Sequence, residues 1–296
     1  MPLQSRAARL LNRKQRLFNL LQSSLPQHLL SRLMYVAARW QWRPWKNLQI
    51  RWFIRHYGVN MQEAVYSSPD DYSCFNDFFT RALKTDARPL APGNSLLSPI
   101  DGSVSQAGRI QASMVIQAKG HDYSLGDLLA GDRNLAGQFI DGSFACLYLS
   151  PRDYHRIHMP CSGRLQRMIH IPGRRFAVNE ISVADINNLF ARNERLINIF
   201  ATDTGPMALI MVGAMFVGSM QTVWTDTLPS RSIGEPQDYD YRNLRITLER
   251  GEEMGRFNMG STVILLFPAG TIEWSKKLSP AQRIHIGEAI GKMADT

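Results

Sequence analysis

The chain has 296 residues, of which 44% are hydrophobic, a composition typical of a globular protein with a substantial core. Its three cysteines, an odd number without framework spacing, argue against a disulfide scaffold and for a reducing compartment. The longest nearly unbroken apolar run, residues 207–220, is interrupted by glycines and is too short to span a bilayer as a helix.

The positive charge of the chain is concentrated at its N-terminus. The formal net charge is +9, and residues 1–62 contain eleven Lys and Arg residues but no Asp or Glu. The rest of the chain therefore carries slightly more acidic than basic residues. This asymmetry indicates a separate role for the N-terminal arm, defined here as residues 1–62.

Three helices are predicted in the N-terminal arm. Leucines recur at helical spacing over residues 10–21, and a second helix is expected over residues 29–37 after a break at Ser24 and Pro26. A third, short helix contains several Trp residues among basic ones and ends at Gly58. Basic helices with one apolar face and Trp near its boundary are typical of segments that lie in a membrane interface.

Other functions also fit a basic helical arm. Binding of nucleic acid is disfavoured, because the arm contains no recognised module and its Trp residues lie within apolar helices. A transit peptide rich in Arg and poor in acidic residues, or an ordinary helical subdomain with a solvated basic face, remains open. We expect residues 1–62 to form a membrane-association region.

From about residue 65 the sequence predicts a domain rich in short strands. A helical turn packed by aromatic side chains is expected over residues 75–81. Strands are predicted over residues 114–118, 144–149, 165–171, 207–217, 244–248 and 262–267. Few helical patterns separate them, which disfavours a parallel βαβ sheet. We therefore predict an α+β protein, with a β-rich catalytic domain over residues 63–296 and a helical N-terminal appendage.

Gly260 and Ser261 directly precede the last predicted strand. Glycine tolerates backbone angles that other residues avoid, so this pair could hold a peptide carbonyl against the serine hydroxyl. A Gly-Ser pair more often marks a simple turn. Other motifs in the sequence are needed to distinguish a reactive serine from a simple turn.

The densest polar cluster follows the strand at residues 144–149 and contains His155 and His158. With Cys161 these histidines are spaced by three residues, as metal ligands can be. Pro160 would break the helix needed to align them, and the chain contains no CxxC pair. We therefore predict no metal site and interpret the two histidines as structural or catalytic.

Asp101 begins an Asp-Gly turn, and such a turn is the usual meaning of this dipeptide. With a histidine at 155 or 158 and with Ser261, it would also supply the orienting carboxylate, the base and the nucleophile of a triad. Sequence spacing alone does not bring these residues together.

Ordered sequence blocks run through nearly the whole chain. They are residues 75–79 (FNDFF), 99–102 (PIDG), 118–121 (AKGH), 148–160, 190–195 (FARNER), 253–257 (EMGRF) and 260–262 (GST). Together they resemble the bacterial-type, pyruvoyl-dependent phosphatidylserine decarboxylases. Two departures are visible: Met259 stands where Leu is common, and Arg174 and Arg175 lie where an acidic residue is common, which could alter the charge of the pocket.

The resemblance implies a self-processing zymogen that converts phosphatidylserine to phosphatidylethanolamine and CO₂. The Ser261 hydroxyl would attack the Gly260 carbonyl, and elimination and hydrolysis of the resulting ester would convert Ser261 into a pyruvoyl group. The long chain, residues 1–260, and the short chain, residues 261–296, would stay associated as a heterodimer. The pyruvoyl cofactor would form a Schiff base with the substrate amine and accept the electrons released as CO₂ leaves.

The resemblance also implies a role for each candidate residue. His158 would take the Ser261 proton, Asp101 would orient the His158 imidazole, and His155 would transfer the proton in decarboxylation. The two histidines could exchange these roles.

A lipid substrate would explain the arm, because the enzyme would act as a peripheral protein on the cytoplasmic face of the bacterial inner membrane. Its partner would then be phosphatidylserine in an anionic membrane surface and not nucleic acid. The processed heterodimer could also assemble into a homo-oligomer.

Two hypotheses from other classes remain at this point. One is a membrane-surface serine hydrolase that uses Asp101, His158 and an intact Ser261 on an external ester. The other is a membrane-binding module without enzymatic activity, in which Gly260 and Ser261 form only a turn. Self-cleavage separates both from the decarboxylase, since neither alternative breaks the chain.

Overall fold

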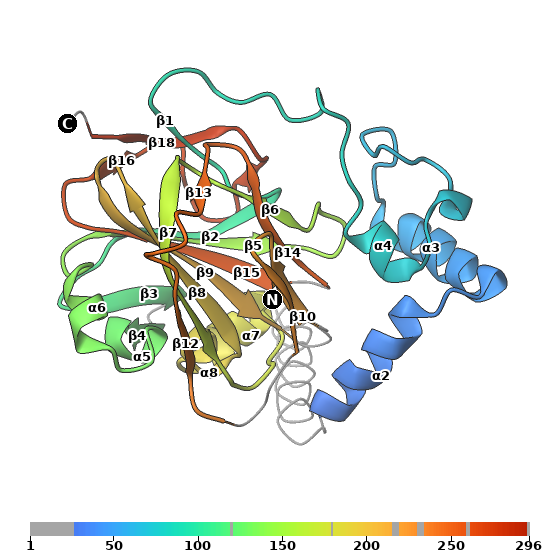
Figure 1. Ribbon diagram of the computed structural model, residues 1–296, viewed down its shortest axis with the longest axis horizontal. Helices are drawn as coiled ribbons and strands as arrows, with labels where there is room; N and C mark the ends of the chain where they lie inside the picture. The colour runs from blue at the N-terminus through green and yellow to red at the C-terminus, as the bar shows by residue number, and fades with distance from the viewer. Residues whose placement is uncertain are drawn as a thin grey trace, which may run out of the picture.

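A β-rich body carries a helical layer along one side in the computed structural model of the chain (Figure 1). The structure describes residues 27–118, 121–178, 180–214, 219–229, 234–258 and 261–294. The helix predicted over residues 10–21 lies outside these ranges. The strands of every described sheet pair in an antiparallel manner, so the predicted α+β class with a β-rich body is confirmed.

The helical layer contains α2 (Gln27–Arg39), α3 (Arg43–Tyr57), the 3₁₀ turn η1 (Pro69–Asp71) and α4 (Phe75–Phe79). A proline lies in the first turn of α3, and Gly58 ends this helix in the left-handed conformation with φ of 65°, as predicted. The buried core of the layer comprises Ala38, Ile50, Phe53, Val59, Tyr72, Phe75, Phe78 and Phe79. This core therefore draws on residues from both sides of residue 62, and α4 joins the layer to the body.

A nine-stranded sheet forms the centre of the body. Its order is β12-β7-β8-β9-β15-β5-β2-β17, and β13 also pairs with β7. The strands are β2 (Gly102–Arg109), β5 (Ser143–Leu149), β7 (Gly163–Ile171), β8 (Arg195–Thr202), β9 (Gly205–Gly213), β12 (Gln237–Asp240), β13 (Thr247–Leu248), β15 (Ser261–Phe267) and β17 (Arg283–Ile284). The strand that begins at Ser261 thus lies in the middle of the largest sheet.

Smaller elements cover this sheet. A four-stranded sheet has the order β11-β10-β14-β6, and shorter sheets are β1-β18-β16 and β3-β4. Their strands are β1 (Ser95–Leu97), β3 (Met114–Ala118), β4 (His121–Ser124), β6 (Arg156–His158), β10 (Ser219–Thr222), β11 (Thr225–Pro229), β14 (Glu253–Phe257), β16 (Ile272–Trp274) and β18 (Ala289–Met293). The short helices of the body are α5 (Leu125–Leu128), α6 (Arg133–Gly137), α7 (Glu180–Asp185) and α8 (Leu189–Arg192).

Strand β15 is buried on both faces because its side chains alternate between two hydrophobic cores. Ile264 and Leu266 pack into the core beneath α5 to α8. Val263, Leu265 and Phe267 pack into the core beneath the four-stranded sheet. A continuous apolar run, which the sequence shows at residues 263–267, is what a strand covered on both sides requires.

The predicted strand at residues 244–248 is shorter than expected, since only Thr247 and Leu248 form β13. Leu244 donates a backbone hydrogen bond to Tyr241, and Arg245 has a φ of 51°, so a turn replaces the first half of the strand. The other predicted strands are present, although residues 215–217 of the run at 207–217 lie outside the described ranges. Among the described residues, no helix is long and apolar enough to cross a membrane.

Candidate active site

The backbone of Ser261 lies at one end of an interior strand of the central sheet. Ser261 is the first residue of β15, and its Cα pairs with Leu149 at the end of β5 and with Gly213 at the end of β9. The polar segment that contains both candidate histidines begins with a loop directly after Leu149; His155 lies in this loop and His158 at the end of β6. The sheet register therefore places the start of this loop beside the predicted cleavage site.

His155 is fully buried and held by the helical layer. Its ring centroid lies 4.0 Å from that of Phe79 in α4, and its Nδ1–H donates to the Asp153 carbonyl oxygen at 2.8 Å. Because a carbonyl oxygen only accepts, the proton sits on Nδ1, and Nε2 has no hydrogen-bond partner in the described structure. Burial, followed by the nearby Arg81 charge, lowers the pKa of His155 to about 3. His155 is therefore a neutral imidazole with an unused lone pair at Nε2.

His158 is positioned in the same way from β6. Its Nδ1–H donates to the Gly251 carbonyl oxygen at 2.7 Å, which leaves Nε2 as the acceptor. The Tyr154 hydroxyl lies 3.3 Å from Nε2 and, because burial raises its pKa to about 12, it stays protonated and donates. Burial lowers the pKa of His158, so this imidazole too is neutral at pH 7. Tyr154 had no role in the sequence prediction, although it lies within the polar cluster.

Asp101 is buried and engaged by an arginine. Arg88 donates to its carboxylate through Nε at 3.0 Å and through Nη2 at 2.6 Å, and the Ile286 backbone N–H donates at 2.9 Å. Arg88 also donates to Glu63 at 2.7 Å, which links Asp101 to the segment that follows α3. Nothing in the local sequence around Arg88 indicates this contact.

The segments that contain Asp101 and His158 meet, although their side chains are not hydrogen-bonded to each other. The His158 backbone N–H donates to the Pro99 carbonyl oxygen at 2.9 Å. Asp101 and Tyr154 line the same cavity of about 250 Å³ between the helical layer and the body. The negative charge of Asp101 raises the pKa of both histidines against the larger, opposite effect of burial. It therefore favours the imidazolium that forms when either histidine takes a proton.

Of the two arginines that depart from the pattern described above, Arg174 is exposed and Arg175 is buried. Arg175 is buried, and its Nε donates to Glu194 at 3.2 Å, while the same carboxylate is 2.9 Å from His170 Nε2. The positive charge of Arg175 is thus compensated by an acidic residue next to β8. The effect of Arg174 and Arg175 on a substrate pocket stays a prediction.

Removing Arg88 should destabilise the fold, since Asp101 would remain buried without its counter-ion. We expect Arg88→Leu to lower the free energy of unfolding by about 3 kcal/mol, as is typical when one partner of a buried ion pair is lost. Arg242→Leu is the matched control, because the Arg242–Asp240 pair is exposed on both sides and should leave the unfolding midpoint unchanged. Equal midpoints for both variants in denaturant unfolding would contradict a structural role of the Arg88–Asp101 pair.

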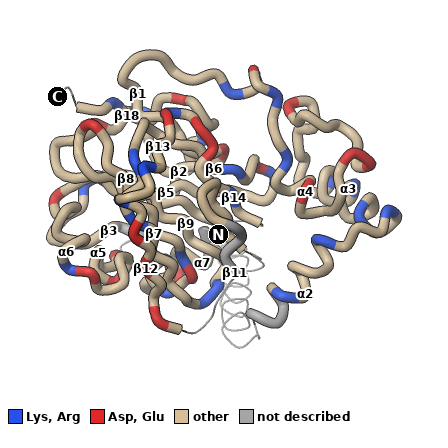
Figure 2. Tube along the Cα trace, in the orientation of Figure 1, with Lys and Arg blue, Asp and Glu red and all other residues tan. Residues whose placement is uncertain are grey.

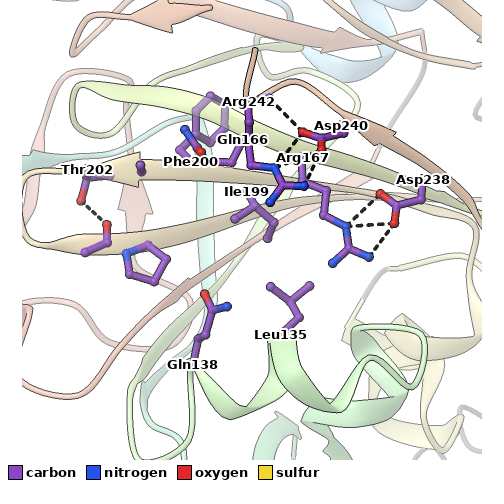
Figure 3. A pocket seen from close by; sticks show the side chains of 13 residues that line it. Leu135, Gln138, Gln166, Arg167, Ile199, Phe200, Thr202, Asp238, Asp240 and Arg242 are labelled. Carbon is purple, nitrogen blue, oxygen red and sulfur yellow. Dashed lines mark hydrogen bonds and ion pairs between the residues drawn. The ribbon is translucent and has the colours of Figure 1, made fainter. Parts of the chain in front are cut away.

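A larger cavity lies elsewhere in the body. It has a volume of about 800 Å³ and lies beside β7, β8 and α6, with Arg167 paired to Asp238 and Arg242 paired to Asp240 along its wall (Figure 3). None of the predicted site residues lines it. The chemistry therefore points to the smaller cavity at the helical layer and not to this larger one.

Comparisons with known proteins agree with the resemblance carried by the sequence blocks. A family model described as phosphatidylserine decarboxylase matches residues 75–292, and a model described as PSD matches residues 17–58. The phosphatidylserine decarboxylase proenzyme of Hahella chejuensis is 49% identical over 282 residues, which cover 95% of this chain and 95% of that protein. The proenzyme of the same description from Stutzerimonas stutzeri is 48% identical over 288 residues, which cover 96% of each chain.

These matches include the segments that hold Asp101, both candidate histidines and Ser261. The family model covers well over half of the chain, and the relatives align with it almost from end to end. The serine hydrolase alternative gains no support from these matches. The chain therefore belongs to the phosphatidylserine decarboxylase family.

Proposed function

We propose that this chain is a phosphatidylserine decarboxylase proenzyme that cleaves itself between Gly260 and Ser261. The observation that carries the proposal is a pair of neutral histidines, His155 fully buried and His158 half-buried, on the segment that begins beside Ser261 in the sheet. Each has its Nδ1 proton fixed on a backbone carbonyl, which leaves Nε2 to act as a base. A serine hydroxyl is a weak nucleophile until such a base removes its proton.

In self-cleavage, His158 Nε2 takes the Ser261 proton as the hydroxyl oxygen attacks the Gly260 carbonyl carbon. The Tyr154 hydroxyl donates to this nitrogen in the structure and orients the ring, and it turns away as Nε2 accepts the proton. Asp101 stabilises the imidazolium through its charge, and Arg88 holds this carboxylate in place. The peptide bond is exchanged for an ester to the Ser261 oxygen, and elimination at this ester separates residues 1–260 from residues 261–296.

The residues present fit a pyruvoyl group derived from Ser261. The unpartnered Nε2 of His155 is a buried polar atom, and such atoms are rare unless a ligand or a reaction uses them. The group supplies a carbonyl that condenses with an amine and accepts electrons when CO₂ leaves. His155 Nε2 can take a proton during the condensation and return it to the carbon atom that has lost CO₂.

The helical layer is the proposed contact with the membrane. Figure 2 shows Lys and Arg residues along α2 and α3, and large apolar side chains between them are more than half exposed. These side chains are Leu33, Val36, Trp40, Trp42, Leu48 and Trp52. Exposed Trp and Leu among cations suit the interface of an anionic leaflet, which favours a peripheral position on the cytoplasmic face of the bacterial inner membrane.

Binding to vesicles should depend on both the charge and the exposed apolar residues of the helical layer. We expect binding to phosphatidylserine vesicles to weaken with added salt and in the absence of anionic lipid, because the attraction is screened. Leu48→Ser should weaken it by about tenfold, as expected for one partly inserted leucine. Leu244→Ser is the matched control, since both leucines are 64% exposed and Leu244 lies in the body. Equal losses in a sedimentation assay would contradict docking through α3.

The activity is tested with phosphatidylserine labelled in its serine carboxyl group. The purified protein should release labelled CO₂ from such vesicles, and treatment with a carbonyl reagent such as phenylhydrazine should stop the release. A hydrolase would instead release serine or a fatty acid, and phenylhydrazine would not inhibit this release. That outcome would overturn the proposed decarboxylation.

A further inference from the structure

Asn258 is the last described residue before the proposed cleavage site, and its side chain is held from two directions. It is 3% exposed. Its Oδ1 accepts from Asn76 Nδ2 at 3.0 Å, and its Nδ2 donates to Ser219 Oγ at 2.8 Å. The Asn258 backbone N–H donates to the Ser219 carbonyl oxygen at 3.0 Å. The amide of Asn258 therefore has a partner at each end, from two different parts of the fold.

The partners of Asn258 come from rigid elements. Ser219 is buried at the start of β10, whose next residue, Met220, pairs with Phe257 at the end of β14. Asn76 lies in the first turn of α4 and is 182 residues away in the sequence. Its backbone carbonyl oxygen accepts from both the N–H and the hydroxyl of Thr80, which fixes the turn. The helical layer and the four-stranded sheet thus both form a hydrogen bond with the Asn258 side chain.

We propose that Asn76 and Asn258 are positioning residues for self-cleavage. The chain leaves the four-stranded sheet at Phe257 and enters the central sheet at Ser261, so the scissile peptide lies in the short crossing between two sheets. Attack of a hydroxyl on the preceding carbonyl needs the two atoms close to van der Waals contact, and small misplacements reduce such rates steeply. Fixing Asn258 fixes one end of this crossing, while β15 fixes the other.

The same helix also positions the segment that contains both histidines. Phe79, one turn after Asn76 in α4, packs on the His155 ring, and the Thr80 carbonyl oxygen accepts from Arg156 Nε at 2.9 Å. One short element thus locates both the crossing before Ser261 and the loop that contains the histidines. This explains why a polar Asn occurs at position 76 among the aromatic residues of α4.

The inference rests on the proposed self-cleavage and is tested by its rate. Loss of the hydrogen bond to Asn258 should slow cleavage of freshly synthesised Asn76→Ala about tenfold in a pulse-chase experiment. Asn258→Ala, which also loses the bond to Ser219, should be slowed at least as much. Because Asn76 acts through its contact with Asn258, the double variant should be at most about threefold slower than Asn258→Ala alone. Effects that multiply in the double variant would contradict the shared contact.

A conservative variant and a matched control separate positioning from general stability. Asn76→Asp should cleave within about threefold of the wild type, because the Asn258 amide can turn over, donate to the carboxylate and accept from the Ser219 hydroxyl. Asn198→Ala removes another buried amide, which donates to the Leu209 carbonyl oxygen between β8 and β9, and should cleave at the wild-type rate despite its lower stability.

Two outcomes distinguish the inference from the function on which it rests. If the wild type is processed at Gly260–Ser261 but both Asn variants match its rate, or Asn198→Ala is slowed equally, the positioning role is wrong and the proposed function stands. If the wild type is never cleaved at this bond, the proposed function itself fails.

Discussion

We expect the Ser261→Ala variant to remain an unbroken chain of about the 33.6 kDa mass of the full sequence and to have no decarboxylase activity. Alanine has no hydroxyl group, so the ester that precedes chain cleavage cannot form. Without cleavage there is no new terminus and no ketone to accept electrons. Denaturing mass spectrometry after prolonged incubation measures the first effect, and release of labelled CO₂ measures the second.

Thr262→Ser provides the control for this variant. Thr262 is the neighbouring buried residue of β15, and the change keeps a hydroxyl on the strand while leaving Ser261 in place. This variant should be processed and active. If Ser261→Ala were still cleaved between residues 260 and 261, the nucleophile would have been assigned wrongly.

The second large effect should separate the two histidines. His158→Ala is expected to block self-cleavage, because no base would remain to take the Ser261 proton. A general base typically raises the rate by about 100-fold to 10,000-fold, so the cleavage rate should fall by a factor of this size. His155→Ala should still be cleaved but should lose turnover by a similar factor. Processing is measured on denaturing gels, and turnover is measured on the fraction of chains that has been processed.

The reverse pattern would exchange the roles of His155 and His158. His285→Ala is the control, since this histidine is exposed and pairs with Glu288, and it should leave both steps unchanged. Loss of both steps in all three variants would indicate misfolding and would contradict the division of labour.

The pH dependence of self-cleavage follows from the direction of the His158 shift. Burial lowers the pKa of His158 below its ordinary value of 6.5, so the imidazole stays neutral as the pH falls through 6.5. A neutral imidazole is the active base, and the cleavage rate should therefore hold at pH 6.5 and decline only in more acidic buffer. A rate that falls with a midpoint at or above pH 6.5 would contradict His158 as the base.

Much of the fold follows from local sequence patterns. The end of α3 at Gly58 and the strands β5, β7 and β15 are all marked by turn residues and by apolar runs of strand length. Strand β2 was missed because its sequence, GSVSQAGR, contains few apolar residues and becomes a strand through its pairing with β5. Strand β8 was missed although it is apolar, since charged and amide residues and not Gly or Pro precede it.

The candidate site was predicted as residue types but not as contacts. The resemblance named Asp101, His155, His158 and Ser261, and the sheet register brings their segments together. The Arg88–Asp101 pair, the packing of Phe79 on His155 and the Asn76–Asn258 bond join residues 13, 76 and 182 positions apart. No local pattern encodes such contacts, since they depend on how the helical layer docks against the body.

Intact mass analysis of the purified wild-type protein under denaturing conditions tests the central claim most directly. We expect two species, residues 1–260 and residues 261–296. The short chain should be lighter than its unmodified sequence by the mass of ammonia and should react with carbonyl reagents. A single unbroken chain after full incubation, or a short chain that begins with an unmodified serine, would contradict this claim.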